Sequence, residues 1–327
     1  MYKLFQPQFK GNKLRGVSVS IRTQRPIFSV VTTAKGETDE DMIRETFESW
    51  SIARESFERR IGRRNLVEFI MVDAGGNVDL SGLVEDHDIR NVSFREYSEY
   101  KDGLYSCGEI LRRRWDSQSI GLNLGLRRAR GELVVFQDID TLMSTGTDFD
   151  DKYVVPELDG YDNYLEAMYK EFRARPIVLG APSLRARYSR SRVRRLGMRG
   201  MNFMTWLSTR LPSFTLFGIP FSLRTPGPSI TCRRDFAQRV AYYHGNRTIE
   251  GPYHPELAMG QDYLFSGSIG MYGKASYVSR AGAFTRTTKR VGGGRFGVLR
   301  FLYFGLKWSP HYIFPGVWRY KRYDLSI

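Results

Sequence analysis

The sequence predicts an α/β fold: a mostly parallel central sheet flanked by helices, followed by a basic and aromatic C-terminal extension. Three observations lead to this prediction. Short runs of β-branched and aromatic residues are typical of buried strands. Between residues 26 and 140 these runs alternate with segments of helical period, as in βαβ units. Finally, several runs end in a carboxylate, as expected where strands meet a ligand-facing edge.

The first strand is expected at residues 26–33 and the first helix at 38–60, with Thr38 as its N-cap. The apolar positions of this helix recur at helical spacing: Ile43, Phe47, Trp50, Phe57 and Ile61. The connecting loop carries Lys35 near the start of the helix. Phosphate or nucleoside groups bind well at such a position, but an ordinary strand–helix turn has the same pattern.

The second strand is expected at residues 66–72, and it ends at Asp73 before Ala74-Gly75-Gly76. An acid at a strand end followed by glycines fits a ligand-facing corner. A solvated turn fits the same residues equally well. A short strand is expected next, at residues 91–97.

A helix at residues 117–129 leads into an apolar strand that ends in Asp138-Ile139-Asp140. Alternate residues of a strand point the same way, so the two carboxylates can converge. Paired carboxylate oxygens suit Mg²⁺ or Mn²⁺, and these ions suit a diphosphate. Most isolated Asp-x-Asp pairs are nevertheless solvated turn residues.

The second half of the chain continues the mixture of helices and strands. The expected elements are a loop at 141–160, helices at 161–173 and 233–243, strands at 176–180, 228–232 and 275–279, a helix from 260 with Asp262 in its first turn, and a basic loop at 285–290.

The charge balance points to an anionic partner. Fifty Lys and Arg against 35 Asp and Glu give a net charge of +15, which suits nucleic acid, a membrane surface or phosphorylated substrates. Seven arginines fall between 185 and 199, beside an apolar and aromatic stretch at 201–221. This pattern indicates an interfacial segment, or a basic lid over an ordinary core helix.

Two cysteines and four histidines at unrelated spacings indicate neither a disulfide framework nor a Cys- or His-based metal site. The cysteine usage suits a reducing compartment. The first ten residues lack the apolar core of a signal peptide, and no apolar run is long enough for a transmembrane helix. We therefore expect a cytoplasmic protein with peripheral contact at the cytoplasmic face of a membrane.

Five motifs occur in an order that resembles family 2 glycosyltransferases with the A-type (GT-A) fold. They are Ser29–Thr33, Val72-Asp73, Asn123-Leu124-Gly125 with Ala129-Arg130-Gly131, Phe136–Asp140, and Gly260-Gln261-Asp262. The resemblance covers about residues 26–290 and implies a Rossmann-like sheet. No single motif is specific, but their order and spacing together are.

The resemblance implies a role for each matched residue. Asp262 would be the general base, Asp140 the metal ligand and Asp138 a second ligand near the ribose. Nucleotide-sugar contacts would come from Thr32, Thr33, Lys35, Glu37, Asp73, Asn123, Asp138, Gln261, Arg286, Lys289 and Arg290. The implied division is an arm or peripheral strand at 1–25, a nucleotide-sugar half at 26–140, an acceptor half at 141–290 with a basic insert at 185–221, and a C-terminal segment at 291–327 that is suited to a membrane interface.

The chain departs from the family pattern at several positions. Thr33 replaces the usual proline, Leu122 replaces a frequent arginine, and Gln261 stands where the family usually has an acid. No Gln-x-x-Arg-Trp motif follows Asp262, which argues against a processive polysaccharide synthase. No histidine lies at 280–290, so a third protein ligand to the metal is not expected there.

The predicted function is inverting transfer of a sugar, of hexosyl type, from a UDP- or GDP-sugar to a glycan or lipid-linked acceptor, with Mn²⁺ or Mg²⁺ as cofactor. A polyprenyl-phosphate acceptor, a sugar nucleotidyltransferase and a basic nucleic-acid-binding protein are the alternatives. The charge clusters in two segments that flank the candidate site, so we do not expect nucleic acid as a partner.

Overall fold

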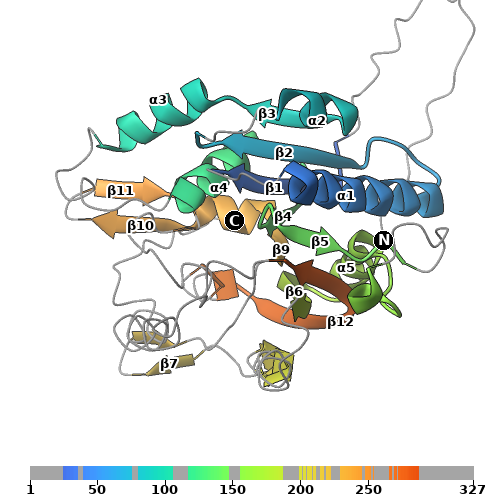
Figure 1. Cartoon of the computed structure of the whole chain (residues 1–327). Coiled ribbons are helices and arrows are strands. Elements are labelled where there is room, and N and C mark those ends of the chain that lie inside the picture. The colour runs from blue at the N-terminus through green and yellow to red at the C-terminus, as the bar shows by residue number, and fades with distance from the viewer. Residues whose placement is uncertain are drawn as a thin grey trace, which may run out of the picture.

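The computed structural model describes residues 25–35, 40–75, 80–105, 117–146, 155–186, 229–244, 247–251 and 272–286, with shorter pieces between 199 and 271. Its main sheet consists of β1 (Phe28–Ala34), β2 (Val67–Asp73), β3 (Ile89–Val92), β4 (Leu133–Gln137), β5 (Thr141–Met143), β6 (Ile177–Ala186), β9 (Ser229–Arg233) and β12 (Lys274–Thr285). Two small antiparallel pairs are β7 (Phe214–Leu216) with β8 (Ile219–Phe221), and β10 (Ala241–His244) with β11 (Arg247–Glu250). The helices are α1 (Glu40–Ile61), α2 (Ser81–Asp86), α3 (Phe94–Tyr105), α4 (Ser117–Arg128), α5 (Tyr164–Ala174) and α7 (Arg234–Arg239), with a 3₁₀ turn η3 at Pro156–Leu158 (Figure 1).

The eight strands of the main sheet lie in the order β3-β2-β1-β4-β9-β6-β12-β5. β1 runs parallel to β2 and β4, and β2 runs parallel to β3. β9 runs antiparallel between β4 and β6, and β12 runs parallel to β6. All strands except β9 and β5 therefore point the same way, and their carboxyl ends share one edge of the sheet, here called the carboxyl edge. This arrangement confirms the predicted α/β fold class.

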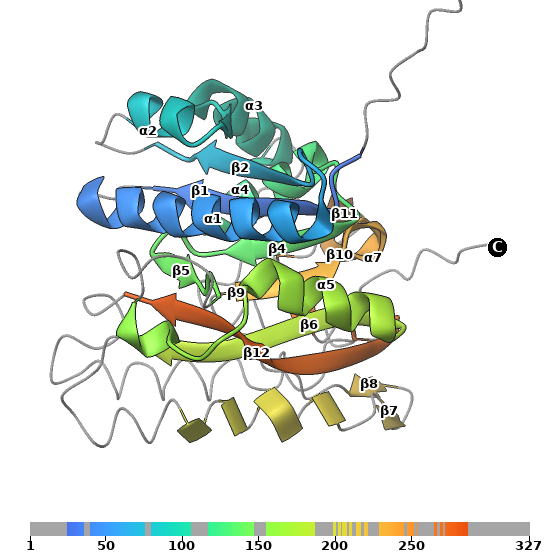
Figure 2. The same cartoon turned by 90° about the vertical axis from the view of Figure 1, so that its right-hand side faces the viewer.

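Helices cover both faces of the sheet. Alternate residues of β1 point to opposite faces: Val30 belongs to the core under α1 and α5, and Val31 to the core under α4 and α7. Helices α1 and α5 lie together on the face turned to the viewer in Figure 2. Trp50 of α1 is fully buried there. Burial of each large apolar side chain contributes about 1.5–3 kcal/mol, so the two cores hold the carboxyl edge in place.

Two predicted elements near the ends of strands differ from the structure. The strand expected at 91–97 ends at Val92, because the Ser93 hydroxyl accepts a hydrogen bond from the Glu96 amide and starts α3. The helix expected at 233–243 ends at Arg239. Extended backbone at Val240 and pairing of β10 with β11 take over the residues that follow.

The strands of the second half are longer than predicted, because β6 and β12 pair with each other along most of their length. Part of the loop expected at 141–160 is strand β5, which pairs with the end of β12 through Thr141↔Thr285. Residues 26–140 and 141–290 thus build one sheet. Within the described part of the chain, no helix is both long and apolar enough to cross a membrane.

Candidate active site

The acidic pair lies at the carboxyl edge, where the chain turns from β4 into β5. The Thr141 amide donates a hydrogen bond of 3.0 Å to the carbonyl oxygen of Asp138 and closes the turn. Asp140 is 8% exposed, with its Oδ1 3.4 Å from the Thr141 hydroxyl, while Asp138 is partly exposed. Both carboxylates therefore lie just beyond the end of β4, but in a turn, so the expectation that they converge as alternate residues of a strand does not apply.

Gln137 fixes this acidic turn from within the core. Its Nε2 donates to the carbonyl oxygen of Thr141 at 2.7 Å, and the Trp50 indole donates to the same oxygen at 3.1 Å. Its Oε1 accepts from the Ser229 hydroxyl at 3.3 Å. A carbonyl with two buried donors is held firmly, so the end of the turn has little freedom to move.

Tyr164 of α5 extends the same buried network. Its hydroxyl lies 2.9 Å from the Ser229 hydroxyl and 3.0 Å from that of Thr231. Burial raises the pKa of Tyr164 to about 12, against the opposing effect of these hydrogen bonds. The phenol therefore stays neutral at physiological pH, and the network supports the turn without adding charge to it.

Arg286, one of the residues predicted to contact the nucleotide sugar, follows β12 and lies beside the acidic turn. Its backbone amide donates to the carbonyl oxygen of Asp140 at 3.1 Å. Its guanidinium forms an ion pair with Glu45 of α1, and its side chain is 15% exposed. The guanidinium is thus held against α1, with Glu45 as its ion-pair partner.

Gln118, in the first turn of α4, connects the acidic turn with the end of β1. Its Nε2 donates to Oδ1 of Asp138 at 2.5 Å, and its carbonyl oxygen accepts from the Thr33 hydroxyl at 3.4 Å. Gln118 is not among the site residues predicted from the sequence. It could have been predicted from its position in the first turn of α4, the helix that precedes β4 and the acidic turn.

Asp73 forms a corner at the end of β2. Its Oδ1 accepts from the Gly75 amide at 2.8 Å, and the neighbouring Ala74 amide donates to the carbonyl of Ala34 at 2.9 Å. The ring of Phe94 packs over Gly75 so closely that a Cβ there would lie 2.8 Å from its Cε2. Phe94 is 50% exposed and was also missed, because the sequence placed it inside a strand.

Three other predicted residues differ in their access to a ligand. Thr32 is fully buried, and its Oγ1 has no hydrogen-bond partner within the described structure. Lys35 is exposed beyond the end of β1. Asn123 is 1% exposed and exchanges two hydrogen bonds with the backbone of Tyr253, at 2.8 and 3.1 Å. Asn123 thus holds the segment around Tyr253, and its contact with a nucleotide sugar stays a prediction.

Several predicted residues lie outside the described part of the chain: Glu37, Gln261, Asp262, Lys289 and Arg290. The expected general base is among them. The other four were predicted to contact the nucleotide sugar, so the donor side and the acceptor side of the site both stay predictions.

The acidic turn fits a divalent cation by its chemistry. Among the described residues, no three His, Cys, Asp or Glu side chains gather in a metal-binding group. Mg²⁺ commonly binds through one or two carboxylates together with substrate phosphates, so Asp138 and Asp140 suffice if a diphosphate supplies the other ligands. Hard oxygen donors of this kind also suit Mn²⁺.

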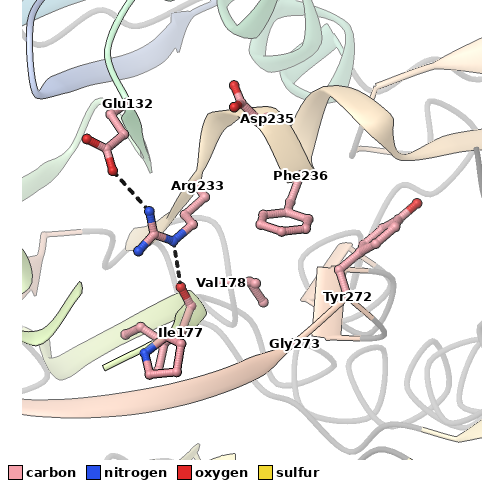
Figure 3. A pocket seen from close by; sticks show the side chains of 9 residues that line it. Glu132, Ile177, Val178, Arg233, Asp235, Phe236, Tyr272 and Gly273 are labelled. Atoms are coloured by element: carbon pink, nitrogen blue, oxygen red, sulfur yellow. Dashed lines mark hydrogen bonds and ion pairs between the residues drawn. The ribbon is translucent and has the colours of Figure 1, made fainter. Parts of the chain in front are cut away.

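A pocket of about 560 Å³ lies at the opposite edge of the sheet (Figure 3). Phe236 and Tyr272 line it, with ring centroids 5.7 Å apart. Arg233 on its wall donates to the carbonyl of Ile177 and to Glu132, both at 3.0 Å. Arg233 is thus engaged in holding strand ends together, and none of the predicted site residues lines this pocket.

No protein-family model matches the sequence, and no curated protein matches it either. Similar solved structures include TarS from S. aureus in complex with UDP-GlcNAc, with 14% identity and a TM-score of 0.49, covering 82% of this chain and 61% of that one. Glucosyl-3-phosphoglycerate synthase from Mycobacterium tuberculosis has 15% identity and a TM-score of 0.47, covering 86% of this chain and 80% of that one. Mannosyltransferase PcManGT from Pyrobaculum calidifontis, in complex with GDP-Man and Mn²⁺, has 16% identity and a TM-score of 0.49, covering 82% and 59%.

The matched regions of TarS and PcManGT are less than two thirds of those chains. Likeness at this level carries no information about substrate or mechanism, so the function has to be argued from the residues of the site.

Proposed function

We propose that this chain transfers a sugar from a nucleoside diphosphate sugar to an acceptor hydroxyl, with inversion at the anomeric carbon. One observation carries the proposal: a row of polar groups along the carboxyl edge, at the ends of the neighbouring strands β2, β1 and β4. The row runs from the Asp73 corner through Thr33 and Gln118 to Asp138, and through the acidic turn to Arg286. An extended ligand with a base, a ribose and a diphosphate matches this order of groups.

Each part of the row has a proposed partner on the donor. Asp73 would accept a hydrogen bond from the base, and the exposed ring of Phe94 would stack against it. Asp138, positioned by Gln118, would lie at the ribose. A divalent ion held by Asp138 and Asp140 would neutralise charge on the departing nucleoside diphosphate. Arg286 would add a positive charge where that negative charge develops.

Asp262 is the proposed general base. Its carboxylate would accept the proton of the acceptor hydroxyl while that oxygen bonds to the anomeric carbon and the bond from this carbon to the diphosphate breaks. Such a base contributes roughly 10²–10⁴ in rate. A phosphate acceptor needs no such base, so near-normal turnover of Asp262→Asn would favour a polyprenyl-phosphate acceptor over a hydroxyl.

A panel of nucleotide sugars tested by thermal shift, with and without Mn²⁺, tests the proposal. A ligand that binds only the folded chain raises the melting temperature, so one UDP- or GDP-sugar should raise it, and more strongly with Mn²⁺. The absence of any shift across the panel would contradict the proposal. Release of pyrophosphate rather than a nucleoside diphosphate during turnover would indicate a nucleotidyltransferase instead.

A further inference from the structure

A helical segment beside the carboxyl edge carries an unusual surface. Residues 199–210 are helical wherever the structure describes them. Arg199, Phe203, Trp206 and Arg210 follow one another at spacings of four, three and four, which places them on one face of a helix. We call these four residues the basic-aromatic stripe.

The stripe is exposed at both arginines and at its first ring. Phe203 is 57% exposed, and among the described residues only Phe94 is another large hydrophobic side chain classed as exposed. The Phe203 and Trp206 rings are stacked, with centroids 5.6 Å apart, and the Arg210 guanidinium lies 4.5 Å above the Trp206 ring. A single exposed apolar residue needs no explanation, but two stacked rings flanked by arginines form a defined surface.

The segment is fixed to the sheet, so the stripe has a definite orientation. The Asn202 side chain exchanges two hydrogen bonds of 2.9 Å with the backbone of Leu184, near the carboxyl end of β6. Thr205 is buried on the inner side. β6 and β12 end at the same edge as β4, which places this anchor at the edge that carries Asp140.

We propose that the basic-aromatic stripe binds the surface of a bilayer that contains anionic lipids. Aromatic rings are favoured at the level of lipid headgroups, and arginines near the surface are attracted to anionic lipids. The net charge of +15 acts in the same direction. Because the stripe adjoins the carboxyl edge, a chain bound in this way would hold its acidic turn close to the membrane.

Single-stranded nucleic acid fits the stripe less well. Bases bind by stacking on free aromatic faces, but Trp206 already has a ring stacked on it and a guanidinium over its face. Insertion of ring edges between lipid headgroups needs no free face. Membrane binding also does not depend on sugar transfer, so the two proposals can fail separately.

Sedimentation with phosphatidylcholine vesicles, with and without phosphatidylglycerol, tests the stripe in the full chain. We expect the wild type to bind the anionic vesicles and Phe203→Ser to bind at least about tenfold more weakly, because burial of a Phe ring is lost. Arg199→Gln with Arg210→Gln should reduce the preference for phosphatidylglycerol, because two positive charges next to the bilayer are lost. Phe203→Trp keeps an aromatic ring and should retain binding. Weaker binding of Phe203→Ser can then be assigned to loss of the ring rather than to a change in the fold.

Phe94→Ser is the matched control, because it removes a similarly exposed ring that follows β3, at one end of the strand order, whereas the stripe is anchored to β6 towards the other end. It should bind vesicles like the wild type. Equal binding by wild type and Phe203→Ser, or no binding by the wild type, would overturn the proposal. The proposal would also be overturned if the stripe variants lost binding to single-stranded DNA but still bound vesicles. Vesicle binding without affinity for any nucleotide sugar would retain this proposal and remove the enzymatic one.

Discussion

The backbone amide of Arg286 donates a hydrogen bond of 3.1 Å to the backbone carbonyl oxygen of Asp140. This bond joins the residue that follows β12 to the turn that follows β4. Because both bonded groups belong to the backbone, substitution of either side chain leaves the bond in place. Variants at these two positions should therefore report on side-chain chemistry more than on folding.

The first prediction concerns Asp140→Asn. The amide keeps the shape of the side chain but loses the negative charge that would hold a cation. We expect donor affinity in the presence of Mn²⁺ to fall by at least about 100-fold, since a metal contributes several kcal/mol and each tenfold corresponds to about 1.4 kcal/mol. Isothermal titration of the nucleotide sugar identified by thermal shift measures this loss.

Asp235→Asn is the control for Asp140→Asn. Asp235 lines the pocket at the opposite edge and its side chain is 67% exposed, so neutralising it changes the total charge equally without touching the acidic turn. Its donor affinity should match that of the wild type. If Asp140→Asn also bound the donor normally with Mn²⁺ present, its assignment as a metal ligand would be wrong.

The second prediction concerns Gln137, a positioning residue that contacts the acidic turn but no ligand. Gln137→Leu removes the 2.7 Å hydrogen bond to the Thr141 carbonyl and leaves the Ser229 hydroxyl one partner short. We expect Mn²⁺ affinity to fall about 10–100-fold, as is typical when outer groups of a metal site are lost. Stability should fall by about 1–3 kcal/mol.

Ser276→Ala separates positioning from stability in this experiment. Ser276 is buried and donates a 2.6 Å hydrogen bond to Glu171, far from the acidic turn along β12. We expect it to lose stability without changing the Mn²⁺ titration. A Gln137→Leu variant with normal Mn²⁺ affinity would show that the network supports only the fold.

The sequence was sufficient to predict the strands that build the carboxyl edge, because their apolar runs are local and strongly patterned. β1 and β2 lie within two residues of the expected ranges, and Asp73 ends β2; β4 is present as well, but it ends at Gln137, so the acidic pair lies in the turn that follows it. What the sequence could not provide was pairing between distant segments. β6 and β12 reach their full length by pairing with each other, and β5 forms by pairing with β12. No local sequence pattern predicts these pairings.

The same limit applies to the site. Gln118 and Phe94 were missed because their importance comes from neighbours in space, Asp138 and Gly75, rather than from their own surroundings in the sequence. The segment 233–243 shows a related effect. Its first half has helical composition and is helical, but the aromatic residues after Val240 pair with β11, so tertiary pairing overrides the local preference.

The third prediction concerns stability and pH. Burial lowers the pKa of His87 below its usual 6.5, although Glu48 and Asp86 act in the opposite direction, and its Nδ1 lies 3.0 Å from the Ser51 hydroxyl. The unfolded chain therefore binds this proton more readily than the folded one. The contribution of neutral His87 to the free energy of unfolding is fully present above about pH 6.5, the usual pKa, and is lost as the pH falls through the lower pKa of the folded chain.

Urea unfolding at a series of pH values tests the effect of His87. Between about pH 7 and 5 the free energy of unfolding should fall more steeply for the wild type than for His87→Gln, which cannot take up the proton. The other titrating groups are common to both proteins and cancel in the comparison. Parallel curves would mean that His87 has the same pKa in the folded and unfolded chains.

The fourth prediction concerns Phe94, whose half-exposed ring covers Gly75 beside the Asp73 corner. If a nucleotide base stacks on this ring, Phe94→Ala should weaken binding of the free nucleoside diphosphate by about 1–3 kcal/mol, roughly 5- to 150-fold. Phe94→Tyr keeps the ring and should bind normally. Phe203→Ala removes an equally exposed ring outside the row of contacts and should leave nucleotide affinity unchanged. If Phe94→Ala bound the nucleoside diphosphate as tightly as the wild type, the base would not lie at this corner. The proposed positions of the base and ribose along the carboxyl edge would then be wrong.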